Sequence, residues 1–289
     1  MIKYYYIAGL SMVFNMMPDD YFESILSPYS ITPISKADLN FEIIKSDIAP
    51  IIPSNIQKRT IGQNKYYCNL DGNDTVFYFD TILNKVIALL TFSEDYSKIT
   101  IKALNIYSPN VSSKYFIFNL VGYALHYIIQ MKGGFVFHSS SICCQKQGIA
   151  FSAKSGTGKT THTSLWLKYI PDCLMLNDDT PIIKLNDNGE VYIYGTPWAG
   201  TTGRHTNFSI PLKALVFIER NETNSIQSIN SDIAIKRFYE GITPPLTPAM
   251  LSSSLYTMDR IISYVPTYLL SCNMQPEAAK VAYEAIFNG

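Results

Sequence analysis

The sequence lacks any strong excess of charge. Charged residues make up only 16% of the 289 residues, and 23 Lys plus Arg balance 23 Asp plus Glu. Proteins that bind nucleic acid or an anionic membrane through their overall field carry a basic face, so this composition argues against both partners. Any anion-binding site in this chain must therefore be local.

The sequence also lacks a disulfide framework and a long apolar run. Its five cysteines are odd in number and none has CxxC spacing, which favours buried, reduced thiols in a cytoplasmic protein over a disulfide scaffold or a zinc site. No run of about 18 apolar residues is present to span a bilayer. The first residues, "MIKYYYIAGLSMVF", lack a small-residue cleavage site, so we expect a strand there rather than a signal peptide.

Residues 1–107 are expected to form a β-rich N-terminal domain. Short apolar runs alternate with turn residues, and "LDGND" between Cys68 and Val76 carries the Asp-Gly signal of a tight hairpin. The pattern predicts an antiparallel meander with one helix at about 18–26. We find no catalytic constellation in this half of the sequence.

Residues 108–289 are expected to form an α/β domain. A helical pattern follows Ser112 or Ser113 as its cap and ends at Gly133-Gly134. The strand "IAFSA", a glycine loop, a helix at 159–169 and the strand "CLMLN" then predict a β-loop-α-β unit with a parallel strand pair. Further helices are expected at 233–239, 248–264 and 276–287, with a strand at 267–270.

The glycine loop "AKSGTGKT" has the composition of a phosphate-binding loop. It follows a predicted strand and opens a predicted helix, so its glycines can turn backbone N–H groups inward at the positive end of the helix. In such a loop the lysine neutralises phosphate oxygens and the next hydroxyl completes Mg²⁺ coordination. The expected nucleotide-binding residues are Ala153, Lys154, Ser155, Gly156, Thr157, Gly158, Lys159, Thr160 and Thr161.

Two adjacent carboxylates follow the next predicted strand. Asp178 and Asp179, in "LMLNDDTP", should lie beside the loop at the end of that strand. Adjacent side chains there point in different directions, so one carboxylate can reach Mg²⁺ while the other faces an incoming hydroxyl. Thr160 and one of these two aspartates are therefore the expected metal ligands.

Taken together, "FHSSSICCQKQGIAFSAKSGTGKTTHTSLW", "LNDDTP" and "YGTPWAGTTG" resemble the HPr kinase/phosphorylase-like branch of the phosphoenolpyruvate carboxykinase superfamily, over about residues 110–225. The resemblance implies a P-loop domain with a mixed sheet and helices, α+β overall. It also implies that His138 is the active-site histidine, Lys159 the catalytic lysine, and Asp179 the base that takes the hydroxyl proton. Asp178 is then left as the aspartate that binds the metal. Arg204 is the available cation for a phosphate or the substrate.

The sequence departs from that family in two places. The family carries a glutamate in a loop like "EIRGLG" that helps to hold the metal, whereas "GTPWAGTTGR" contains no acid, and residues 1–107 do not match the family's N-terminal domain. Small proteins of this kind resemble kinases encoded beside ribosomal-peptide genes, some of which phosphorylate a serine of a precursor peptide. The resemblance therefore implies a protein or peptide acceptor, and a sheet edge in residues 1–107 offers a docking site for it.

Three functions remain open from the sequence. The first is a Mg²⁺-dependent serine kinase that uses ATP, with GTP or pyrophosphate as other donors. The second is a small-molecule or carboxykinase-like enzyme, and the third is a nucleotide sensor without catalysis. The sequence does not decide between a monomer and a homo-oligomer. We expect His162 and His205 to lie on the surface rather than to act as ligands.

Overall fold

The computed structural model describes residues 2–15, 20–105, 113–186 and 188–288. These residues form two compact units, Met1–Ile128 and Ile129–Gly289. The division lies within helix α2 (Ser113–Met131), whose first turns pack on the N-terminal unit, where Phe118 contacts Phe22. The expected boundary at 107/108 falls outside the described residues, as does Ser112, one of the two expected caps.

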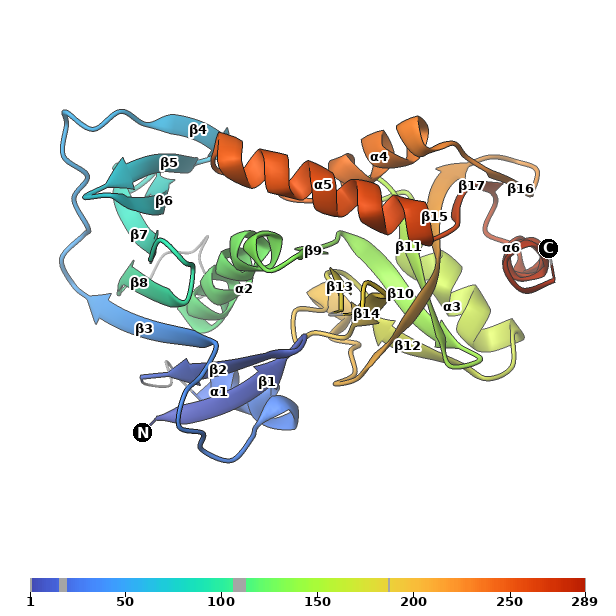
Figure 1. The fold of residues 1–289 in the computed structure, drawn as a ribbon, viewed down its shortest axis with the longest axis horizontal. Helices are drawn as coiled ribbons and strands as arrows, with labels where there is room; N and C mark the ends of the chain where they lie inside the picture. Colours follow the sequence, from blue (N-terminus) through green and yellow to red (C-terminus); the bar gives the residue numbers. More distant parts are fainter. Residues whose placement is uncertain (1, 16–19, 106–112, 187, 289) are drawn as a thin grey trace. The chain divides into compact units, whose positions relative to one another are not determined.

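The N-terminal unit is built on a sheet whose strands have the order β1-β2-β3-β8-β7-β6-β5-β4 (Figure 1). Asp71 and Gly72, both with positive φ, form the tight turn between β5 and β6, which confirms the hairpin expected from "LDGND". The elements are β1 Lys3–Ile7, β2 Leu10–Phe14, α1 Asp20–Leu26, a 3-10 turn Ser27–Tyr29, β3 Leu39–Ser46, β4 Arg59–Gly62, β5 Lys65–Leu70, β6 Asn73–Asp80, β7 Lys85–Phe92 and β8 Lys98–Leu104.

This sheet is not a pure antiparallel meander. Strands β5 to β8 do form one, but β3 pairs in parallel with both β2 and β8. The expectation failed because β3 returns to the centre of the sheet after a connection that contains α1, and alternation within a strand carries no signal about its direction.

The C-terminal unit carries a mixed sheet with the order β12-β10-β11-β15-β14-β13-β9, to which β17 and β16 are added beside β15. Its fold class, α/β with a mixed sheet, is as expected. The elements are β9 Gly134–Val136, β10 Ser139–Cys144, β11 Gln147–Ser152, α3 Lys159–Tyr169, β12 Cys173–Asn177, β13 Ile182–Leu185, β14 Val191–Tyr194, a 3-10 turn Gly200–Thr202, β15 Ser209–Arg220, β16 Ser225–Ser228, α4 Ser231–Glu240, α5 Pro248–Tyr264, β17 Thr267–Cys272 and α6 Pro276–Phe287.

Alternating side chains of the central strands supply two cores, one on each face of this sheet. In β15, Leu215 and Phe217 join the core that contains Phe238 of α4 and Met258 of α5. Val216 joins the opposite core, which contains residues of α3 and α6. The unit therefore has three layers, with β11 and β15 central between two pairs of helices.

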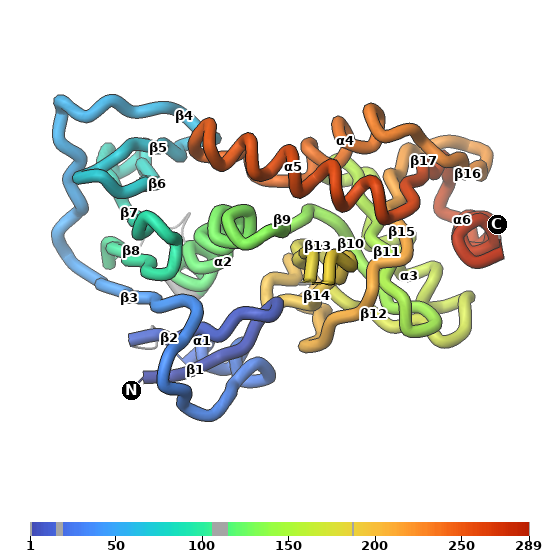
Figure 2. The backbone as a smooth tube through the Cα atoms, viewed as in Figure 1, coloured from blue at the N-terminus to red at the C-terminus, as the bar shows by residue number. Residues whose placement is uncertain are grey.

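The expected parallel pairing of the strands that flank α3 is wrong. β12 pairs antiparallel with β10, so β10 lies between β11 and β12, and the parallel neighbour of β11 is β15 (Figure 2). β10 occupies one edge of β11 and β15 occupies the other, so β12 adds to the free edge of β10. The phosphate-type loop still begins at the carboxyl end of β11, and β15 and β17 end at the same edge because both run parallel to it.

The remaining expectations concern the cysteines, the last helices and strands, and membrane-spanning segments. All five cysteines are free, four of them are buried, and Cys173 is half-buried. Helices α5 and α6 have the predicted bounds, whereas strand β16 was not anticipated. None of the helices in the described ranges is long and apolar enough to cross a membrane.

Candidate active site around the phosphate-type loop

The loop between β11 and α3 has the backbone that phosphate binding requires. Gly156 and Gly158 have φ values of 76° and 115°, which residues with a side chain adopt only with strain. The guanidinium of Arg220 donates to the carbonyl oxygens of Gly156 and Thr157, the latter at 3.0 Å. The carbonyl of Thr157 and the N–H of Gly158 belong to one peptide unit and point in opposite directions. The N–H of Gly158 is therefore turned away from Arg220.

Lys159, His138 and Asp179 form a continuous chain of polar contacts. The ammonium of Lys159 lies 2.9 Å from His138 Nε2 and donates to the carbonyl of Ala153 at 3.1 Å. His138 Nδ1 in turn lies 3.3 Å from Asp179 Oδ1. An ammonium only donates, so Nε2 accepts, and the neutral imidazole carries its proton on Nδ1, facing Asp179. The third N–H of Lys159 remains available to a ligand.

Burial and charge act on Lys159 in opposite directions. Its side chain is 9% exposed, and this burial lowers the pKa of the ammonium, while the nearby carboxylates of Asp179 and Asp178 oppose the shift. The two carboxylates therefore help to keep a buried cation charged at the mouth of the loop.

Asp178 is the buried member of the acidic pair. It is 5% exposed, and its Oδ1 accepts a hydrogen bond of 2.6 Å from Ser140, whose hydroxyl also lies 2.8 Å from that of Thr163 on α3. Its second oxygen, Oδ2, is buried and has no partner among the described residues. A buried carboxylate oxygen without a donor is costly, so its environment is suited to a cation.

Asn177 holds the acidic pair in place. Its side-chain oxygen accepts from the backbone N–H groups of Asp179 (2.9 Å) and Thr180 (2.8 Å), while its amide donates to Thr196. Gly200 packs directly against Asp179, since a Cβ on Gly200 would lie only 3.0 Å from that of Asp179. The loop 196–203, which contains no acid, therefore supports Asp179 sterically.

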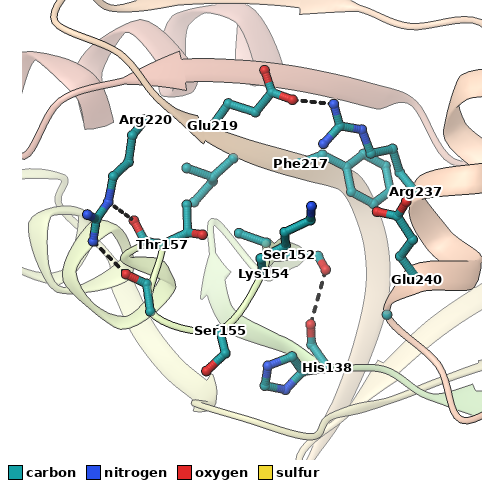
Figure 3. Close-up of a pocket in the computed structure, with 14 residues that line it drawn as sticks. His138, Ser152, Lys154, Ser155, Thr157, Phe217, Glu219, Arg220, Arg237 and Glu240 are labelled. Atoms are coloured by element: carbon teal, nitrogen blue, oxygen red, sulfur yellow. Dashed lines mark hydrogen bonds and ion pairs between the residues drawn. The ribbon is translucent and has the colours of Figure 1, made fainter.

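A cavity of about 700 Å³ opens beside the loop, within the size range of ligand sites (Figure 3). His138 and Ser155 lie on one side of it, and the ion pair of Glu219 and Arg237 lies on the other. The carboxylate of Glu240 also lines the cavity. The site thus combines a phosphate-type loop with space for a substrate.

The structure brings together most of the residues that the sequence singled out. Lys154, Ser155, Gly156 and Thr157 line the cavity with Ala153 and His138. Thr160 begins α3 beside Lys159, and its hydroxyl has no hydrogen bond within the described ranges. No cluster of three or more His, Cys, Asp or Glu side chains suited to a metal occurs among the described residues.

Two expected residues lie elsewhere. Thr161 is exposed on α3. Arg204 is also exposed and is absent from the lining of the cavity, although its carbonyl accepts from the N–H of Asp178 at 3.2 Å. Arg220 and Arg237 are the arginines that line the cavity, so the role expected of Arg204 stays a prediction.

His162 was expected on the surface, but it is buried. His205, also expected on the surface, is half-buried. His162 is 3% exposed on α3, and its Nε2 accepts a hydrogen bond of 3.0 Å from the indole N–H of Trp166. An indole N–H only donates, so the single proton of the neutral imidazole lies on Nδ1. Burial lowers the pKa of His162 to about 4, and the ring is therefore neutral at physiological pH.

We expect His162 to make the protein less stable in mild acid. The pKa of His162 is about 4 in the folded chain, against about 6.5 for an unperturbed histidine. As pH falls from 6.5 to about 4, His162 binds a proton in the unfolded chain but not in the folded chain. The free energy of unfolding therefore falls by about 3 kcal/mol in that pH range. Urea unfolding at several pH values should show a shallower pH dependence for His162→Gln than for the wild type. Equal slopes would contradict a neutral, buried His162.

Sequence reasoning missed the residues that support the acidic pair and the loop. Ser140 and Arg220 lie on strands outside the motif, Thr163 lies one turn into α3, and none of the three shows a local pattern. Asn177 did carry a signal, because an Asn directly before a turn often accepts hydrogen bonds from the next backbone N–H groups.

No family model matches the chain, and no curated protein matches it. Among solved structures, the chain is similar to the Hpr(Ser) kinase/phosphatase from Coxiella burnetii, with a TM-score of 0.31 and 11% sequence identity, over 52% of this chain and 89% of that chain. A similarity of this size carries no weight for function or for individual residues, so both rest on the geometry described above.

Proposed function

We propose that this protein is a Mg²⁺-dependent phosphotransferase that moves the γ-phosphate of ATP to a hydroxyl of a protein or peptide. The observation that carries the proposal is the contact chain from Lys159 through His138 to Asp179, beside a glycine loop and an open cavity. This chain supports the proposal because it joins a cation suited to phosphate and a carboxylate suited to a hydroxyl proton.

The residues around Asp178 fit a bound Mg²⁺. The unpartnered Oδ2 of Asp178 and the hydroxyl of Thr160 are hard oxygen ligands of the kind that this ion prefers. When bound, Mg²⁺ neutralises charge on the phosphate oxygens. The few protein ligands are in keeping with magnesium sites in which phosphate oxygens and water complete the coordination.

Asp179 is assigned as the base. Its side chain is 36% exposed, whereas Asp178 is buried and already accepts from Ser140, so Asp179 is the carboxylate that an acceptor can reach. It takes the proton of the acceptor hydroxyl as that oxygen bonds to the γ-phosphorus, and the bond from phosphorus to the bridging oxygen of ADP breaks. The proton on His138 Nδ1 faces Asp179 and orients it.

The N-terminal unit offers a place for a peptide acceptor. Of its two edge strands, β1 is partly covered, because Ile31 donates to Tyr4 and Tyr5 bridges to Ser30. Strand β4 (Arg59–Gly62) is the other edge, and three of its four residues are exposed. We assign peptide docking to this edge, where an added strand gains backbone hydrogen bonds.

One assay tests both parts of the proposal. The protein is incubated with γ-labelled ATP, Mg²⁺ and serine-containing peptides, and label on serine is measured together with amide hydrogen exchange. We expect label on serine, and slower exchange at Arg59–Gly62 when peptide is bound. Tight ATP binding without any labelled acceptor would favour the sensor instead. Unchanged exchange in β4 at saturating peptide would remove the docking assignment.

A further inference from the structure

A second cavity, of about 280 Å³, lies at the helix end of the loop. It is lined by Gly158 and His162, by Ile218 and Arg220 at the end of β15, and by Cys272 and Met274 at the end of β17. Because β11, β15 and β17 run parallel, these residues lie at the carboxyl edge of the sheet, where ligands of parallel sheets bind.

His162 forms part of the wall of this cavity. The residue lines the cavity and is 3% exposed, and the indole of Trp166 donates to its Nε2. Its Nδ1 has no partner among the described residues and is itself closed to solvent, so the ring contributes to the wall as an aromatic group.

The walls of the cavity suit a flat aromatic ring. Ile218 and Cys272 are buried and apolar, and the thioether of Met274 lies against Gly158, where an added Cβ would approach its Cε to 2.7 Å. Arg220 adds a planar guanidinium that is held by two loop carbonyls. Aliphatic, thioether and guanidinium groups all pack favourably on aromatic faces.

The two cavities border the same loop. Thr157, Ile218 and Arg220 line both of them, while His138 lines only the larger one. A ligand with phosphates in the loop therefore has its transferable end beside His138 and its other end beside the smaller cavity. The smaller volume lies just below the range of about 300–1,000 Å³ for whole ligands, which suits one ring system of a larger molecule.

We propose that this cavity binds the nucleobase of the donor nucleotide. The assignment rests on the proposed function, because it requires phosphates in the loop. It adds a specificity site that uses none of the residues assigned to transfer.

The test compares Mg²⁺-ATP with Mg²⁺ and inorganic tripolyphosphate, which has the phosphates and no base. By calorimetry, the wild type should bind ATP about 10-fold or more tightly than tripolyphosphate. Met274→Trp, which fills the cavity, should remove that preference and leave tripolyphosphate affinity within about twofold. Met131→Trp, at a partly exposed methionine on α2, is the matched control and should retain the preference.

If the wild type binds tripolyphosphate as tightly as ATP, or if Met274→Trp weakens both equally, the base does not occupy this cavity and the inference is wrong. If neither ligand binds, the loop does not bind phosphate, and both the proposed function and this inference are wrong.

Discussion

Replacing Asp179 with asparagine is expected to slow phosphate transfer about 10²–10⁴-fold, the usual loss when a general base is removed. The affinity for ATP should change little, because Asp179 contacts His138 and is not the carboxylate assigned to the metal. The amide retains the shape that packs against Gly200, so the loss should come from chemistry rather than from folding. Single-turnover transfer and equilibrium binding of ATP measure the two effects separately.

The matched control is Asp172→Asn. Asp172 is an exposed residue with a φ of 56°, a conformation that asparagine tolerates well, and it lies in the turn before β12 rather than at its carboxyl end. This variant removes the same charge and should transfer phosphate at the wild-type rate. Equal transfer by wild type and Asp179→Asn would show that the base is another group, and Asp178→Asn would then be the variant to compare.

The parts of the site that are close in sequence could be predicted from the sequence. The loop from Ala153 to Thr160 specifies its own shape, because Gly156 and Gly158 supply the positive φ values and α3 begins directly after them. Helices α5 and α6 were equally readable, since each begins with a proline in its first turn and keeps a helical repeat to its end.

Properties that depend on distant strands could not be predicted. The choice of β10 as the neighbour of β12 decides that Ser140 reaches Asp178, and nothing in either strand's alternation encodes that pairing. Arg220 reaches the loop only because β15 runs parallel to β11 and ends at the same edge. Helical spacing alone does not show that α3 packs on a core containing Phe151 and Trp166, so the sequence does not predict that His162 is buried.

Replacing Lys159 with alanine is expected to have the largest effect, because it should impair both binding and transfer. Loss of a charge-assisted contact to phosphate costs about 1.5–3 kcal/mol, which corresponds to a roughly 10- to 150-fold weaker affinity for ATP. Loss of a cation that stabilises the transferring phosphate lowers the rate by a further factor of about 10³–10⁵ in comparable phosphoryl-transfer sites. Titration of ATP and single-turnover transfer at saturating ATP give the two values.

The variant also leaves two of the protein's own groups without a partner, namely His138 Nε2 and the carbonyl of Ala153. Thermal unfolding therefore has to accompany the kinetics, so that a folded but inactive protein is distinguished from an unfolded one. Lys168→Ala is the matched control, because Lys168 is an exposed lysine of α3 that does not line the cavity and has no ion pair among the described residues. If Lys159→Ala is folded and still binds ATP as tightly as the Lys168→Ala protein, the loop does not hold phosphate through Lys159. The contact chain to His138 and Asp179 would then be a structural element rather than part of a transfer site.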